Sequence, residues 1–475
     1  MKLRHNFSWT LIGNAIYAAC QWGMLVVIAK LGSPEMVGQF TLGLAITAPV
    51  IMFTNLHLRT VQVTDAKQEF LFGDYLALRI IGTTLSMLAI FGIVATAGYK
   101  LETSLTILAI ATAKAFESIG DVCYGFVQQN EQMDRIARSM IVKGILSLTL
   151  MSLGVYISGS VLWGTVGLAV AWGIVLVSID LPNTSKILIK SSSAKLARSA
   201  EMSSVISIKP DWNSRNIYRL AKLSLPMGLA KILFALNIVM PRSRWELKSL
   251  AKLAWLSLPL GFVMMLISLN LNVPRYFIQN YLGEKTLGIF GALSYLMVVG
   301  NIVIGALAES SSARLAKYYA AAERRKFTVL LLQLLTIFGG FGIGGVLLAW
   351  IGGKQVLALI YRPEYAQHEE VFFWLTIAAG IGYVSSGLGY AMTAARYFRV
   401  QIPLFMTVTA TSALGCLWLI PTMGMKGAAL ALTMAAVVQL LLNLGVITHA
   451  LLKLKQRSTA LSPQFWSESR CASTR

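Results

Sequence analysis

The sequence predicts an all-α protein that crosses a membrane about twelve times. Of its 475 residues, 56% are apolar and 13% are charged, about half the charged fraction of a soluble protein. The mean hydropathy is +0.67. So little polar surface cannot enclose a water-soluble core, which excludes a soluble globular domain. The length accommodates about twelve to fourteen helices of membrane-spanning size, joined by short loops.

Twelve apolar segments follow one another, each roughly as long as a helix that crosses a bilayer. They are residues 7–29, 36–56, 76–98, 103–126, 137–157, 160–181, 253–273, 287–308, 327–350, 371–393, 402–420 and 426–452. Two groups of six predict two six-helix bundles, residues 1–182 and 250–452. A basic cytoplasmic loop over 183–249 joins the bundles, and a basic cytoplasmic tail covers 453–475.

The charge of the chain is strongly basic, with 41 Lys and Arg against 20 Asp and Glu. In a soluble protein this excess would suggest nucleic acid, but in a multi-pass protein it marks the loops that stay in the cytoplasm. A cytoplasmic N-terminus leaves few basic residues in external segments, namely Lys30, Lys100, Arg275, Lys285, Lys354, Arg362 and Lys426. We therefore expect both termini in the cytoplasm and no nucleic-acid partner.

The two halves share short motifs. Leu31-Gly32 followed by Gly38-Gln39-Phe40 recurs as Leu282-Gly283 followed by Gly288-Ile289-Phe290. The stretch 164–169 (GTVGLA) similarly recurs at 424–429 (GMKGAA). Because each half holds an even number of spans, both halves enter from the same side. Such repeats occur in transporters that rock around a cavity at the membrane midplane.

A second repeat lies in the loop between the bundles. Residues 220–242 align without gaps to 253–275 and are identical at 12 of 23 positions. The apolar part of the first copy is short for a membrane span and carries Lys231 near its middle. We expect segment 223–241 to be an interfacial or re-entrant helix rather than a thirteenth span.

No motif indicates catalysis, a metal or a cofactor. The four histidines and four cysteines are scattered, without the spacing of a metal site. Residues 340–345 (GFGIGG) fit the GxGxxG pattern but lie inside an apolar span, where small residues typically let helices pack closely. The sequence therefore predicts that the protein is not an enzyme and needs no cofactor.

Ionisable residues at membrane depth are the strongest functional signal. Lys114, Glu117 and Asp121 fall within about 60° of one another on the fourth span. A charge at the bilayer centre costs about 3 kcal/mol or more, so this stripe should face protein or water. Lys114 could simply neutralise one carboxylate. It cannot neutralise both, which makes Glu117 and Asp121 candidates for ion coupling.

Other polar residues at depth suggest a cavity between the halves. They include asparagines in the first helix of each half, and the candidates are Asn14, Asn270, Asn272 and Asn301. Near the cytoplasmic span ends lie Arg59, Arg79, Lys143 and Arg396. Each of these bases alone is expected to hydrogen-bond between helices or to extend to the interface.

Several stretches resemble the bacterial polysaccharide-biosynthesis (O-antigen type) flippases of the multidrug/oligosaccharidyl-lipid/polysaccharide exporter superfamily. They are 38–44 (GQFTLGL), 53–56 (FTNL), 58–65 (LRTVQVTD), 72–79 (FGDYLALR), 258–261 (LPLG), 273–277 (VPRYF) and 389–398 (GYAMTAARYF). The resemblance implies two six-helix bundles forming a V in the bacterial inner membrane. It also implies a polyprenyl-diphosphate-linked oligosaccharide as substrate, with the lipid bilayer and polysaccharide polymerase or assembly proteins as further partners.

Cationic side chains are expected where a diphosphate binds, and the candidates are Arg59, Lys114 and Arg275. Arg275 is equally well explained as an anchor at the external interface. One alternative function is a drug or cation antiporter, which would need uncompensated carboxylates. A glycan polymerase or ligase is a second alternative, although the longest external segment, 351–370, is short for a catalytic loop.

Reporter fusions test the predicted topology. Fusions at residue 200, at residue 245 and at the C-terminus should all report a cytoplasmic location, because the basic loop and tail stay inside. An external signal at residue 245 would mean that segment 223–241 crosses the membrane and that the second half is inverted.

Overall fold

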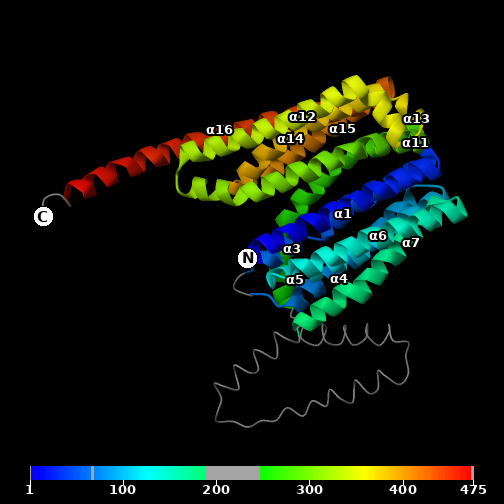
Figure 1. Cartoon of the computed structure of the whole chain (residues 1–475), viewed down its shortest axis with the longest axis horizontal. Coiled ribbons are helices and arrows are strands. Elements are labelled where there is room, and N and C mark those ends of the chain that lie inside the picture. Colours follow the sequence, from blue (N-terminus) through cyan, green and yellow to red (C-terminus); the bar gives the residue numbers. More distant parts are fainter. Residues whose placement is uncertain (1, 66–68, 189–246, 472–475) are drawn as a thin grey trace, which may run out of the picture. The chain divides into compact units, whose positions relative to one another are not determined.

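The computed structural model describes residues 2–65, 69–188 and 247–471. It is an all-helical, multi-span membrane protein, and its described residues contain ten helices long and apolar enough to cross a bilayer (Figure 1). One of the ten, α11 (Leu247–Ala320), contains both the seventh and the eighth predicted spans. The fourth span is α5 (Leu101–Gln129), whose charged residues set it apart from the ten. Every predicted span coincides with helix to within two residues.

The chain divides into two compact units. Unit 1 comprises residues 1–27 and 46–265, and unit 2 comprises residues 28–45 and 266–475. Three helices belong to both units, namely α1 (Lys2–Leu31), α2 (Pro34–Thr54) and α11. The predicted extra segment at 223–241 lies outside the described residues.

Unit 1 is built from the helices that follow α2. They are α3 (Leu58–Thr64), α4 (Phe72–Thr96), α5, α6 (Met133–Ser158), α7 (Val161–Val175) and a π-helical turn η1 (Leu176–Asp180), after which helix continues to Leu188. Local signals set the boundaries. Gly159 ends α6 at φ +65°, and the Ser160 hydroxyl accepts the Leu162 N–H to begin α7.

A break after α2 positions α3. Leu56 and His57 both have left-handed backbone angles, with φ of 50° and 51°. Such angles are unusual for residues other than glycine, and two in succession end one helix and redirect the chain. The short helix that follows packs against α5.

Unit 2 contains most of α11 and the remaining helices. They are α12 (Arg324–Ile360), α13 (Pro363–Ala366), α14 (Glu369–Ala394), α15 (Phe398–Met423) and α16 (Met425–Cys471). Figure 1 shows α12, α14, α15 and α16 side by side. In the GxGxxG stretch of α12, only Gly342 packs tightly, against Gly380 of α14, while Gly340, Gly344 and Gly345 border open space. The packing interpretation therefore holds for Gly342.

The repeated glycine motifs of the two halves meet inside unit 2. A Cβ atom at Gly38 would collide with the carbonyl oxygen of Glu284, and one at Gly288 with that of Pro34. Each copy thus contributes a glycine that the backbone of the other copy approaches. Gly283, with φ +81°, provides the kink of α11 beside this contact.

Polar contacts surround the glycine contact. Gln39 donates to Glu284 at 3.4 Å, and Arg362 donates to the Lys30 carbonyl oxygen at 2.6 Å. Lys285 pairs with Glu364 at 2.8 Å.

Alanine substitutions test the glycine contact. Gly38→Ala and Gly288→Ala should each destabilise the purified protein by about 1–3 kcal/mol through overpacking, seen as a lower melting temperature. Alanine favours helix over glycine by about 1 kcal/mol, so a loss must come from the contact. Gly344→Ala, with no atom within 4 Å of its added Cβ, is the matched control and should not lower the melting temperature. An unchanged melting temperature for Gly38→Ala would contradict the contact.

Candidate functional site

Seven ionisable residues gather in unit 1 around the polar stripe of α5. We call them the charged cluster: Arg59, Arg79, Lys114, Lys143, Glu117, Asp121 and Asp180. They come from α3, α4, α5, α6 and η1. Four bases stand against three carboxylates, so the cluster carries a net charge of +1 when all seven are ionised.

Asp121 joins two arginines. Its Oδ1 accepts from Arg59 Nη1 at 3.4 Å and its Oδ2 from Arg79 Nη2 at 3.1 Å. The Arg79 side chain is 0% exposed, and its Nε and Nη1 have no hydrogen-bond partner. The Arg59 side chain is 34% exposed, although Gln128 accepts two of its hydrogen bonds. Arg79 is therefore fixed inside unit 1, whereas Arg59 remains accessible.

Two features of the backbone bring Arg59 to α5. The left-handed turn at Leu56 and His57 starts α3 with Arg59 in its first turn. Gly125 then lets α3 approach, because a Cβ there would collide with the Gln62 side chain and touch Arg59 Cγ. The nearby Gln129 donates to the Gln62 carbonyl oxygen.

Lys114 and Glu117 form a second pair. Lys114 Nζ lies 2.7 Å from Glu117 Oε2, and Tyr17 of α1 donates to Glu117 Oε1 at 2.8 Å. The two side chains are 28% and 31% exposed. The sequence argument assumed that Lys114 is the only base within reach of the two carboxylates of the stripe. The structure corrects that premise, because Glu117 pairs with Lys114 and Asp121 has its own arginines.

Lys143 is buried, which argues against one of its two predicted roles, a side chain that extends to the interface, and leaves contact between helices. It is 2% exposed, and its Nζ lies 5.1 Å from the ring centroid of Tyr124 and 5.7 Å from that of Trp172. Arg59 also lies over Tyr124, and Lys114 over Trp172. These cation–π contacts join the two halves of the cluster through two aromatic rings.

Asp180 is the member that the sequence analysis missed. It is 3% exposed, and the Ser139 hydroxyl, itself bonded to the Tyr124 hydroxyl at 2.9 Å, donates to its Oδ1. The available signal was a lone carboxylate at the end of an otherwise apolar span. The predicted span ended at residue 181, and a carboxylate one residue before a span end did not stand out.

The remaining predicted residues are not members of the charged cluster. Asn14 is exposed on α1, and Asn301 is exposed on α11. In unit 2, Arg275 donates to Asn272 at 2.8 Å, and Asn272 donates to the Ser268 carbonyl oxygen at 2.8 Å. Asn270, nearby, is half-buried and its Oδ1 has no hydrogen-bond partner.

The chemistry of the cluster suits an anion rather than a metal. Within the ranges that the structure describes, no group of three or more His, Cys, Asp or Glu could hold a metal ion. Guanidinium and ammonium groups with net positive charge instead match phosphate oxygens.

Removing Asp121 tests the arginine network. Asp121→Ala should lower the stability of the purified protein by about 2 kcal/mol or more, because the buried Arg79 loses its acceptor. Glu102→Gln, an exposed position on the same helix, is the control and should melt like the wild type, because glutamine can still accept the hydrogen bond from the Ser160 hydroxyl. Equal melting temperatures for Asp121→Ala and Glu102→Gln would refute a structural role for the network.

Comparisons place the whole chain among known proteins. No family model matches the sequence. The capsular polysaccharide biosynthesis protein CapF of Staphylococcus aureus is 27% identical over 444 residues, covering 92% of this chain and 97% of CapF.

Solved structures share the fold at low sequence identity. An inward-facing multidrug resistance MATE family transporter of the MOP superfamily matches with a TM-score of 0.64 and 14% identity, over 94% of this chain and 99% of that one. The lipid II flippase MurJ matches with a TM-score of 0.57 and 13% identity, over 95% and 90%. The chain is thus a distant homologue of CapF and has the fold of the MOP superfamily.

Proposed function

We propose that the protein is a flippase that moves a polyprenyl-diphosphate-linked oligosaccharide across the bacterial cytoplasmic membrane for surface polysaccharide synthesis. The observation that carries the proposal is the net positive charge of the charged cluster. Arg59 and Lys114 are each about one third exposed, so an anionic group can reach them. The relationship to a capsular polysaccharide biosynthesis protein supports the same substrate class.

The cost of moving a sugar headgroup through hydrocarbon would explain why such a protein has polar residues in its interior. A sugar headgroup carries many hydroxyl groups, each costing several kcal/mol to bury without a hydrogen-bond partner, so unaided flipping is very slow. The isoprenoid chain can stay in the bilayer while a polar path carries the headgroup. Arg59 and Lys114 would then bind the diphosphate, with Arg79 and Lys143 adding positive potential from buried positions.

An antiporter of cationic drugs would need the opposite charge balance. In the described part of unit 1, Glu117 pairs with Lys114, and Asp121 pairs with Arg59 and Arg79. A cation entering this site would meet four bases. The charge balance therefore favours an anionic substrate over a cationic drug.

The further elements of the proposal follow from the flippase role. Both termini lie in the cytoplasm, transport proceeds by alternating access, and Asn14, Asn270, Asn272, Arg275 and Asn301 are the candidates for binding the sugar. The partners are the bilayer, the lipid-linked oligosaccharide and the polymerase or assembly proteins that receive it.

Binding and export assays test the proposal together. Arg59→Ala and Lys114→Ala should weaken binding of farnesyl diphosphate to the purified protein at least tenfold, but leave binding of farnesol unchanged. Both variants should lose export of the lipid-linked glycan at normal protein level, whereas Lys114→Arg should keep part of the export. Lys100→Ala, an exposed lysine outside the cluster, is the matched control.

A double variant separates binding from folding. If Lys114 only neutralises Glu117, then Lys114→Ala with Glu117→Gln should restore export, because no unpaired charge remains. Such a rescue would refute the role of Lys114 in substrate binding. Preferred binding of a lipophilic cation by the wild type would favour the antiporter instead.

A further inference from the structure

Asp180 differs from the other two carboxylates of the charged cluster in its partners. Glu117 and Asp121 each contact a base within 4 Å, but among the described residues no such ion pair reaches Asp180. Its Oδ1 accepts from Ser139, while its Oδ2 is buried and has no hydrogen-bond partner. A buried carboxylate with one oxygen lacking a hydrogen-bond partner calls for an explanation, which the paired carboxylates do not.

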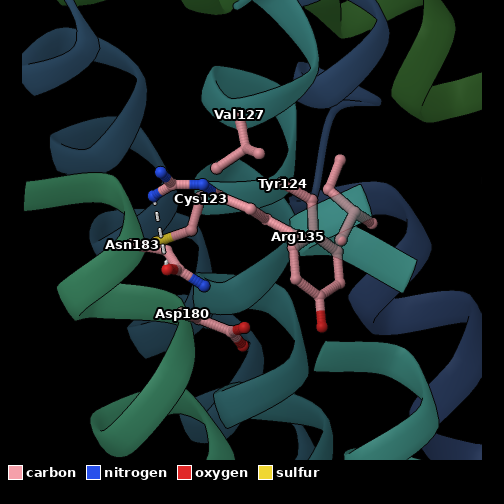
Figure 2. A pocket seen from close by; sticks show the side chains of 7 residues that line it. Cys123, Tyr124, Val127, Arg135, Asp180 and Asn183 are labelled. Atoms are coloured by element: carbon pink, nitrogen blue, oxygen red, sulfur yellow. Dashed lines mark hydrogen bonds between the residues drawn. The ribbon is translucent and has the colours of Figure 1, made fainter. Parts of the chain in front are cut away.

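A small pocket opens beside this carboxylate (Figure 2). Asp180, Asn183, Arg135 and Cys123 line it, and it has room for about one water molecule. Arg135 already donates to Asn183 Oδ1 at 3.5 Å. Asp180 also ends the π-helical turn η1, and such turns recur at functional sites because they interrupt the regular backbone hydrogen bonding.

The charged and titratable groups around Asp180 come from two neighbouring helices. From α5 these are Cys123 and Tyr124, and from α6 they are Lys143 and Arg135. The positive charges of Lys143 and Arg135 disfavour a metal cation as the ligand of this carboxylate. A proton is the cation that fits, since it neutralises Asp180 without needing further oxygen ligands.

We propose that Asp180 is a proton-binding site that controls the anion affinity of the charged cluster. With Asp180 ionised, the cluster carries +1, and Lys143 is balanced by Asp180 and Glu117 together. With Asp180 protonated, the net charge rises to +2 and the cluster attracts a diphosphate more strongly. By linkage, a bound diphosphate favours proton uptake at Asp180 by the same factor. This second step rests on the proposed function, whereas the proton site does not.

Gly120 gives a way to perturb the carboxylate without changing a charge. A Cβ atom there would lie 3.2 Å from Asp180 Oδ2 and 3.7 Å from Lys143 Nζ. Gly120→Ala therefore places a methyl group against the unpartnered oxygen and hinders its hydration. Gly92→Ala, on α4 with no atom within 4 Å of its added Cβ, is the matched control.

Infrared difference spectroscopy of the full-length protein in liposomes tests the proton site directly. A carbonyl stretch of a protonated carboxyl group should appear in the wild type as the pH is lowered. It should be absent in Asp180→Asn. The midpoint of this titration should move to higher pH in Gly120→Ala and in Ser139→Ala, because both changes destabilise the ionised form of Asp180. It should stay unchanged in the control Gly92→Ala.

A titrating band that persists in Asp180→Asn, or a wild type without any such band, would overturn the proposal. If Asp180→Asn does not fold, an unmoved midpoint in both Gly120→Ala and Ser139→Ala would overturn it equally.

Binding of farnesyl diphosphate tests the linkage separately. Affinity of the wild type should fall about tenfold as Asp180 ionises, the effect of a unit charge roughly 10 Å away. In Asp180→Asn, the affinity should depend on pH only through the titration of farnesyl diphosphate itself. A titrating band without any diphosphate binding would support the proton site while refuting the proposed function. Diphosphate binding with the same pH dependence in both proteins would overturn the linkage.

Discussion

Burying ionised side chains at membrane depth is the constraint on which unit 1 depends. Each member of the charged cluster would cost several kcal/mol alone in hydrocarbon. The cost is offset only where α3, α4, α5, α6 and η1 bring opposite charges and aromatic rings together. The left-handed turn before α3 is a local strain that this arrangement accommodates, and Gly125 leaves room for α3 to approach α5. The pairing of these charges therefore lets the helices that carry them pack together.

Within the cluster, burial separates two kinds of base. Arg79 and Lys143 are almost completely enclosed, whereas about one third of the Arg59 side chain and slightly less of the Lys114 side chain are exposed. In the proposed function, the enclosed pair would fix the geometry and contribute potential, and the exposed pair would contact the diphosphate. Such a site would be preorganised, because little rearrangement would be needed when the anion binds.

The sequence predicted the helices well and the cluster only in part. Long apolar runs define most of the spans, although segment 223–241 stays a prediction, and the spacing of Lys114, Glu117 and Asp121 on one helix identified the stripe. The partners of the stripe lie on other helices, and single-chain periodicity carries no information about which helices meet. Arg79 and Lys143 were assigned to span ends for that reason, and Asp180 was not singled out. The position of α3 depends on positive φ angles at Leu56 and His57. These angles could not be predicted from the sequence, because leucine and histidine rarely adopt them.

The reciprocal glycine contact in unit 2 limits which substitutions the two repeats can accept during evolution. Gly38 admits the backbone at Glu284, and Gly288 admits the backbone at Pro34. A larger side chain at either glycine would collide with the backbone of the opposite copy. Substitutions in one repeat are therefore constrained by the sequence of the other. A hybrid that takes only one half from a divergent relative would inherit a mismatched junction, whereas exchange of both loops together would keep the fit.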